Sequence, residues 1–291
     1  MISSELARKI RYIQITTSKA VNDVLAGEYN SVFKGRGMEF DEVREYAPGD
    51  EIRTIDWNVT ARMGHPYVKR YVEERELTVM FLVDLSASGA FGSVSKTKNE
   101  LAAELCALLA FAAIKNNDKV GLVVFTDEIE KFIPPKKGTS HVLRLIRDVL
   151  EFKPREAATN LGEAFDYLGR VMRRKCVVFL ISDFQSEGFE QSMRIVGKRH
   201  DLIAVSVTDP REKRMPDVGL VELEDAETGE IVFLDTSSGA VRKRYETLGR
   251  ERSDRLQKMF RSMDVDHVPV VTGDDYVKDL VRFFRVRERR L

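Results

Sequence analysis

The chain has few cysteines, no excess of charge of either sign and no long apolar run. Its 291 residues include two cysteines, Cys106 and Cys176, which are too few for a disulfide framework and lack the Cys-x-x-Cys spacing of a redox or zinc site. Basic and acidic residues number 47 each, so the net charge gives no general reason to expect nucleic-acid or anionic-membrane binding. The longest apolar stretch, residues 101–114, contains Glu104 and predicts a buried helix, because it is too short to cross a bilayer.

What is present fits a globular protein with one or two domains. Hydrophobic residues make up 43% of the chain, enough for a sizeable core without disulfides. The N-terminus has no apolar segment of the kind that signal peptides carry. We therefore expect a cytoplasmic protein without a membrane span, in which both cysteines are inert core thiols.

Two segments precede the main part of the chain. Apolar residues at helical spacing predict an amphipathic helix over residues 5–26, with Gly27 where it stops, so residues 1–27 are assigned to an N-terminal helix. Glycines and prolines divide residues 28–76 into short strand-like pieces, which predicts a small β-rich block.

From residue 77 onward, apolar runs alternate with helical patterns. The runs are continuous, as in strands buried on both faces, and lie at residues 77–83, 120–125, 176–181 and 202–207. Such alternation is typical of a mostly parallel sheet covered by helices on both faces. We predict an α/β, doubly wound domain over residues 77–291, with a hairpin around residues 224–230.

Polar side chains follow the carboxyl ends of two of these predicted strands. Asp84-Leu85-Ser86-Ala87-Ser88 comes after the first strand and Asp183 after the third, while Thr159 opens a helix predicted at 160–173. Ligands of open α/β sheets bind outside the carboxyl ends of the strands. Carboxylate and hydroxyl oxygens are hard ligands that suit Mg²⁺, Mn²⁺ or Ca²⁺. The candidate metal ligands are Asp84, Ser86, Ser88, Thr159 and Asp183.

Each of these residues also has an ordinary structural interpretation. The serines suit a loop, and Thr159 and Asp183 suit helix N-caps. Capping alone would not be expected to place all five at strand ends of one sheet, so we favour metal binding. Gly89, directly after the second serine, is expected to make the loop flexible and to retune the site.

The pattern of Asp84-x-Ser86-x-Ser88, Thr159 and Asp183 resembles the metal-ion-dependent adhesion site of von Willebrand factor A domains. This resemblance covers roughly residues 77–285. The upstream block resembles the bacterial family of unknown function numbered 58, whose members join such a block to an A-type domain. The similar segments are residues 33–40, 44–50, 52–57, 61–62, 68–70 and 73–76.

The resemblance implies a protein-binding module. In adhesion sites of this kind, five side chains hold Mg²⁺ or Mn²⁺ and leave one coordination position open for an Asp or Glu of a protein partner. Members of the family are commonly linked with MoxR-type AAA+ ATPases and thought to work with them in chaperone-like assemblies. The resemblance therefore implies a MoxR-type ATPase, or the substrate that it remodels, as the partner, and no nucleic acid is expected.

The sequence offers little support for an enzyme. It has no Gly-x-Ser-x-Gly, no Walker A sequence and no Gly-x-Gly-x-x-Gly after a strand, and its four histidines are scattered. Metal-dependent phosphoryl hydrolysis is the alternative function, because Mg²⁺ beside Asp84 and Asp183 would polarise a phosphate. No attacking group is evident, so we expect no enzymatic activity.

The charged residues of the upstream block allow two interpretations. Asp50, Arg53, Asp56, Trp57 and Arg62 form either a partner-docking surface or a paired-charge network that fixes the block in place. We favour the network for Asp56 and Trp57, and leave Arg53 and Arg62 open.

Overall fold

The computed structural model describes residues 4–21, 25–33, 39–72, 76–152, 158–224 and 229–290. The chain divides into two compact units. The smaller one is Phe33–Leu77, and the larger one joins Met1–Val32 to Thr78–Leu291. None of the helices in the described ranges combines the length and apolar character needed to cross a bilayer.

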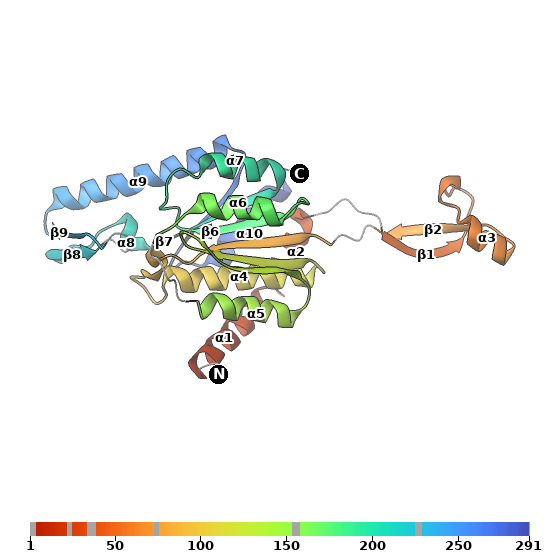
Figure 1. The fold of residues 1–291 in the computed structure, drawn as a ribbon, viewed down its shortest axis with the longest axis horizontal. Coiled ribbons are helices and arrows are strands. Elements are labelled where there is room, and N and C mark those ends of the chain that lie inside the picture. Colours follow the sequence, from red (N-terminus) through yellow and green to blue (C-terminus); the bar gives the residue numbers. More distant parts are fainter. Residues whose placement is uncertain are drawn as a thin grey trace. The chain divides into compact units, whose positions relative to one another are not determined.

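The larger unit is built on a six-stranded sheet with the strand order β10-β7-β6-β3-β4-β5 (Figure 1). All neighbours in it are parallel except β5, which pairs with β4 antiparallel at one edge. The predicted α/β, doubly wound and mostly parallel fold is therefore confirmed. The strands are β3 (Thr78–Asp84), β4 (Lys119–Phe125), β5 (Ile129–Lys136), β6 (Val177–Ser182), β7 (Asp201–Thr208) and β10 (Asp266–Val271).

Helices cover both faces of this sheet (Figure 1). One face carries α4 and α5, with α1, α2 and α10 packed beside them, and the other face carries α6, α7 and one end of α9. The helices are α1 (Ser4–Ala20), α2 (Ala26–Val32), α4 (Lys98–Lys115), α5 (Thr139–Leu150), α6 (Leu161–Val171), α7 (Glu190–Arg199), α8 (Pro210–Lys213), α9 (Gly239–Ser262) and α10 (Tyr276–Glu288).

Alternating side chains of the central strands form a core on each face of the sheet. On one face, Phe81 and Phe179 stack with their ring centroids 5.6 Å apart. On the other face, the core cluster includes Met80, Leu82, Phe165, Val178, Leu180, Met193 and Phe260. Helix α4 is buried around most of its circumference because it lies between the sheet and the helices α1 and α5, which explains why its residues 101–114 are apolar apart from Glu104.

The N-terminal helices pack within the larger unit. Tyr29 of α2 is buried, and its hydroxyl donates a hydrogen bond of 3.0 Å to Asp118 Oδ2. Its ring meets Phe284 of α10 edge-on at 6.0 Å. The helix predicted over residues 5–26 is observed as α1, which ends at Ala20, and Gly27, where the sequence predicts an end, lies inside the separate helix α2.

The smaller unit contains a two-stranded antiparallel sheet of β1 and β2, in agreement with the predicted β-rich block. Asp56 has a structural role, since its Oδ1 accepts hydrogen bonds from the backbone N–H groups of Asn58 and Val59 and so caps α3. Trp57, the first residue of α3, is 67% exposed. The elements are β1 (Glu39–Glu45), the 3₁₀ turn η2 (Ile52–Thr54), α3 (Trp57–Met63) and β2 (Tyr67–Val72).

Gly121 in β4 has no room for a side chain. A Cβ there would lie 2.6 Å from Met80 Sδ and 3.0 Å from the carbonyl oxygen of Ile133. We expect Gly121→Ala to lower the free energy of unfolding by about 1–3 kcal/mol through overpacking, as measured by urea denaturation. The control is Gly169→Ala in α6, where a Cβ meets nothing within 4 Å and stability should be kept or raised. Equal losses in the two variants would contradict this explanation.

His267 on β10 makes stability depend on pH. Burial, assisted by Lys213, lowers the pKa of His267 from 6.5 to about 4, and its Nε2 shares a hydrogen bond of 2.8 Å with Ser206 Oγ. The unfolded chain therefore takes up a proton first, so the contribution of His267 to stability is present above pH 6.5 and is lost toward pH 4. When the pH is lowered from about 7 to about 4.5, the free energy of unfolding of His267→Gln should fall by about 2 kcal/mol less than that of wild type. Urea denaturation at both pH values measures this, and parallel pH profiles would refute it.

Candidate metal centre

A small cavity lies at the carboxyl edge of the sheet, where β3 and β6 end side by side. Its volume of about 10 Å³ is roughly that of one water molecule or ion. Four of the five predicted ligands are among the residues that line it, namely Asp84, Ser86, Ser88 and Asp183. Parallel strands bring their carboxyl ends to one edge, which is why residues about a hundred positions apart meet here.

Asp84 is the last residue of β3, and the pairing of β3 with β6 places it beside Ser182. Its Oδ2 accepts a hydrogen bond of 2.6 Å from Ser182 Oγ, and its Oδ1 accepts one of 3.0 Å from the Ser86 N–H. Burial and the nearby Asp183 carboxylate raise the pKa of Asp84 to about 6, against the effect of these hydrogen bonds. Among the described residues no cation pairs with Asp84, so this buried carboxylate lacks a counter-ion of its own.

The two serines are held by the short 3₁₀ helix η3 (Ala87–Ala90). Ser86 Oγ and Ser88 Oγ lie 3.1 Å apart, and both side chains are buried. A Cβ at Gly89 would lie 1.9 Å from Asn99 Oδ1. Glycine at this position therefore permits the close approach of the loop to α4, which differs from the expected role in loop flexibility.

Asp183 follows β6 and has a cationic partner. Its Oδ1 accepts a hydrogen bond of 3.2 Å from the Gln185 N–H, and its Oδ2 lies 2.7 Å from Lys98 Nζ. Lys98 is 3% exposed and also donates to Glu212 Oε1 at 2.6 Å. Burial lowers the pKa of Lys98, but the Asp183 and Glu212 carboxylates outweigh this effect and raise it above its ordinary value. The ammonium is therefore charged at neutral pH.

Thr159 lies at the same edge of the sheet but not in the cavity lining. It immediately precedes Asn160, which caps α6 by accepting a hydrogen bond from the Glu163 N–H. The Asn160 N–H donates to the carbonyl oxygen of Thr126, just beyond β4, at 2.8 Å. Of the five predicted ligands, Thr159 is therefore the one that the structure does not place around the cavity.

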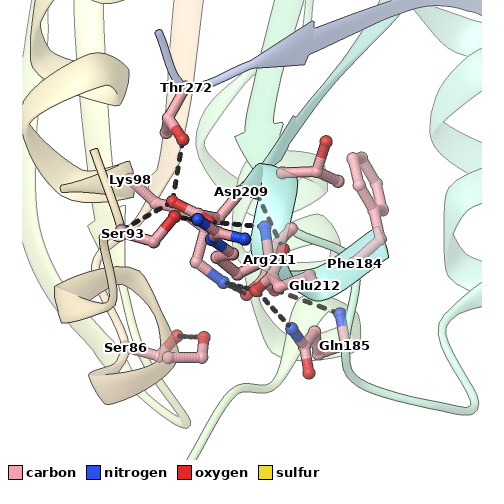
Figure 2. A network of polar contacts seen from close by, with 12 residues as sticks. Ser86, Ser93, Lys98, Phe184, Gln185, Asp209, Arg211, Glu212 and Thr272 are labelled. Carbon is pink, nitrogen blue, oxygen red and sulfur yellow. Dashed lines mark hydrogen bonds and ion pairs between the residues drawn. The ribbon is translucent and has the colours of Figure 1, made fainter. Parts of the chain in front are cut away.

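A polar network anchors α8 beside the site (Figure 2). The buried Asp209 accepts hydrogen bonds from the Ser93 N–H at 2.8 Å, the Arg211 N–H at 2.8 Å and Thr272 Oγ1 at 2.9 Å, and it also bonds the Ser93 hydroxyl. The Asp209 N–H in turn donates to Glu212 Oε2 at 2.9 Å, completing a capping box. These contacts fix the Glu212 carboxylate opposite Lys98 (Figure 2).

Sequence reasoning missed three residues of this site: Lys98, Ser182 and Glu212. The pattern Asp209-Pro210-x-Glu212 directly after a predicted strand is a capping-box signal and would have identified Glu212 as ordered. Ser182 is the last residue of β6 and directly precedes Asp183, so its polar side chain lies at the same edge of the sheet. No local pattern indicated that Lys98 is buried, because lysine is seldom buried without a partner that is distant in sequence.

The donor set suits a hard divalent cation. Within the described ranges, no three His, Cys, Asp or Glu side chains gather into a metal-binding group, so the serine hydroxyls are needed to complete a site around the two carboxylates. Oxygen donors of this kind are those that Mg²⁺ and Mn²⁺ prefer. The cavity has the volume for one ion, and the uncompensated charge of Asp84 favours a cation there.

The α/β fold of the larger unit is shared by a solved structure. A crystal structure of an aerotolerance-related membrane protein from Bacteroides fragilis matches it with a TM-score of 0.51, over 74% of this chain and 100% of that chain. The sequence identity is 16%, so this likeness shows the fold alone. The SpRpn10 VWA domain has a TM-score of 0.41 over 71% of this chain and 94% of that chain, at 10% identity.

Sequence comparison identifies the family. The family described as "Protein of unknown function DUF58" matches residues 42–255. The uncharacterized protein Rv1480 of Mycobacterium tuberculosis is 31% identical over 288 residues, which cover 98% of this chain and 90% of the relative. The chain belongs to the DUF58 family, so the resemblance of the upstream block to the family numbered 58 is confirmed.

Ser182 should contribute strongly to the stability of this edge of the sheet. Its hydroxyl donates to Asp84 and accepts a hydrogen bond of 2.9 Å from the Phe184 N–H. Ser182→Ala removes a hydrogen-bond partner from the Asp84 carboxylate and from the Phe184 N–H, and we expect a loss of about 1–3 kcal/mol in the free energy of unfolding, measured by urea denaturation.

Ser186→Ala is the matched control for this prediction. Ser186 Oγ is buried and has no hydrogen-bond partner among the described residues, so its removal should leave stability unchanged or slightly higher. A Ser182→Ala variant as stable as Ser186→Ala would show that the Ser182 bonds contribute nothing.

Proposed function

We propose that this protein is a metal-dependent protein-binding module. Mg²⁺ or Mn²⁺ is held by Asp84, Ser86, Ser88 and Asp183, with Thr159 contributing from the edge of the site, some of them through water. The observation that supports this proposal is the convergence of two carboxylates and two hydroxyls on one ion-sized cavity. A bound metal supplies a positive centre with an open coordination position, which takes an Asp or Glu of a protein partner.

The charge of the site is consistent with an acidic partner. Ser86, Ser88 and Thr159 are neutral ligands, and the Asp183 charge is shared with Lys98. A divalent cation would therefore keep a positive field toward its open position and attract a further carboxylate. The site is proposed to bind and not to catalyse, since binding a carboxylate requires no nucleophile or general base.

The surface beyond α8 supports a protein as the partner. The antiparallel hairpin of β8 (Leu220–Glu224) and β9 (Ile231–Asp235), as predicted, follows α8 in the chain (Figure 1). It exposes large apolar side chains, with Leu220 72% and Phe233 62% accessible. Apolar groups gathered on an exposed hairpin are typical of protein-interaction surfaces. The family resemblance makes a MoxR-type AAA+ ATPase, or a substrate that it remodels, the candidate partner.

Calorimetric titration of Mn²⁺ and Mg²⁺ into the full chain tests the metal site. We expect one ion to bind per chain, and Asp84→Asn to weaken binding at least about tenfold because it removes a charged ligand. The control is Asp127→Asn, since Asp127 also follows a strand at this edge but lies outside the cavity lining. Measurable binding with equal affinities in wild type and Asp84→Asn would refute the site.

The same preparations test the partner and the alternative function. In a pull-down, immobilised wild type should retain a MoxR-type ATPase in Mg²⁺ and lose it when a chelator is added. The Asp84→Asn variant should not retain it.

The alternative of phosphoryl hydrolysis predicts turnover of an aryl phosphate that Asp183→Ala abolishes. Such turnover would replace the binding proposal with an enzymatic one.

A further inference from the structure

Lys98 brings a positive charge to the place where the proposed metal would bring its own. The Lys98 ammonium lies 2.7 Å from Asp183 Oδ2 and 2.6 Å from Glu212 Oε1. Asp183 therefore already has a cation as partner. Asp84, by contrast, is bonded by serine hydroxyls and a backbone N–H, and no cation among the described residues pairs with it.

The position of Lys98 is unfavourable for a lysine in other respects. Its side chain is almost wholly buried, and burying an ammonium is costly without partners. It is also the first residue of α4, at the end where the helix dipole disfavours cations. Thr97 and Glu100 already cap this helix, so the helix start has no need of the lysine. The carboxylates of Asp183 and Glu212 are the groups that favour a cation here.

We propose that Lys98 is an internal competitor of the divalent metal. In the metal-free site its ammonium neutralises Asp183, and metal binding displaces it from Asp183 so that it pairs with Glu212 alone. This inference rests on the proposed metal-binding function and adds a regulatory element to it. Because the ammonium and the metal repel each other and share one carboxylate, each lowers the affinity of the site for the other.

Glu212 is suited to act as the positioning residue in this exchange. Its Oε2 is fixed by the Asp209 N–H at 2.9 Å, and Gln185 Nε2 donates to its Oε1 at 3.3 Å. A carboxylate held in this way stays in place when Lys98 leaves Asp183. It therefore offers the displaced ammonium a partner within the protein, which avoids leaving a buried charge unpaired.

Calorimetry of Mn²⁺ binding to the full chain tests the competition. Lys98→Met removes the ammonium and should raise the affinity for Mn²⁺ at least about tenfold. The matched control is Lys96→Met, which removes the same charge two residues earlier, where the ammonium pairs with Glu104 at 2.7 Å. This control should change the affinity by less than about twofold. Lys98→Gln serves in place of Lys98→Met if circular dichroism shows that the methionine variant is misfolded.

A double-mutant cycle tests the role of Glu212. Glu212→Gln removes the second partner of Lys98 and should lower the affinity for Mn²⁺, because the ammonium then stays on Asp183. In the Lys98→Met background the same substitution should change the affinity little, since no ammonium remains to be held. A merely structural role of Glu212, or a direct attraction to the metal, would lower the affinity equally in both backgrounds and would overturn this part of the inference.

The outcomes separate this inference from the function on which it rests. Asp84-dependent binding by wild type, with equal or weaker binding by Lys98→Met, would overturn the competition and leave the metal site intact. Binding by Lys98→Met alone, lost when Asp84→Asn is added, would support both proposals. Absence of binding in both proteins would overturn both.

Discussion

Two carboxylates, Asp84 and Asp183, end adjacent strands of a parallel sheet and are buried beside each other, and much of the nearby structure compensates their charge. Ser182 and the Ser86 N–H donate to Asp84, whereas Lys98 pairs with Asp183. Hydrogen bonds alone leave the Asp84 pKa raised, at about 6. A pair of buried carboxylates therefore needs positive charge, and the protein itself supplies only one cation to it among the described residues.

The two carboxylates come together because the strands of the sheet are parallel, and the sequence predicts these parallel strands. Continuous apolar runs identify β3, β4, β6 and β7, because a strand buried on both faces needs apolar side chains on both. Once those strands are parallel, the residues at the carboxyl ends of β3 and β6 lie at one edge of the sheet, and they meet because the two strands are neighbours. The convergence of Asp84 with Asp183 could thus be deduced from strand ends, without knowledge of any contact.

Other features depend on contacts that no local pattern encodes. The burial of Lys98 requires Asp183 and Glu212, which lie 85 and 114 positions away in the chain. Thr159 immediately precedes the Asn160 cap of α6 and does not follow a strand, so strand order alone does not fix its position. Gly27 lies inside the separate helix α2 and not at a helix end, because Tyr29 packs against Phe284 and bonds Asp118, a tertiary effect that outweighs the local helix-stop signal.

The polar network also joins the cavity to the segment that leads to the exposed hairpin. Glu212 contacts Lys98 with one oxygen and the Asp209 N–H with the other, while Asp209 is tied to the loop at Ser93 and to Thr272 beyond β10. If a metal displaces the ammonium from Asp183, Lys98 pairs with Glu212 alone, so the ion pair that holds α8 changes with the occupancy of the cavity. A partner that binds better when Lys98 pairs with Glu212 alone would strengthen metal binding. By reciprocity, the metal would strengthen the binding of that partner by the same factor. A site with an internal cation would then bind metal and partner together more readily than either alone.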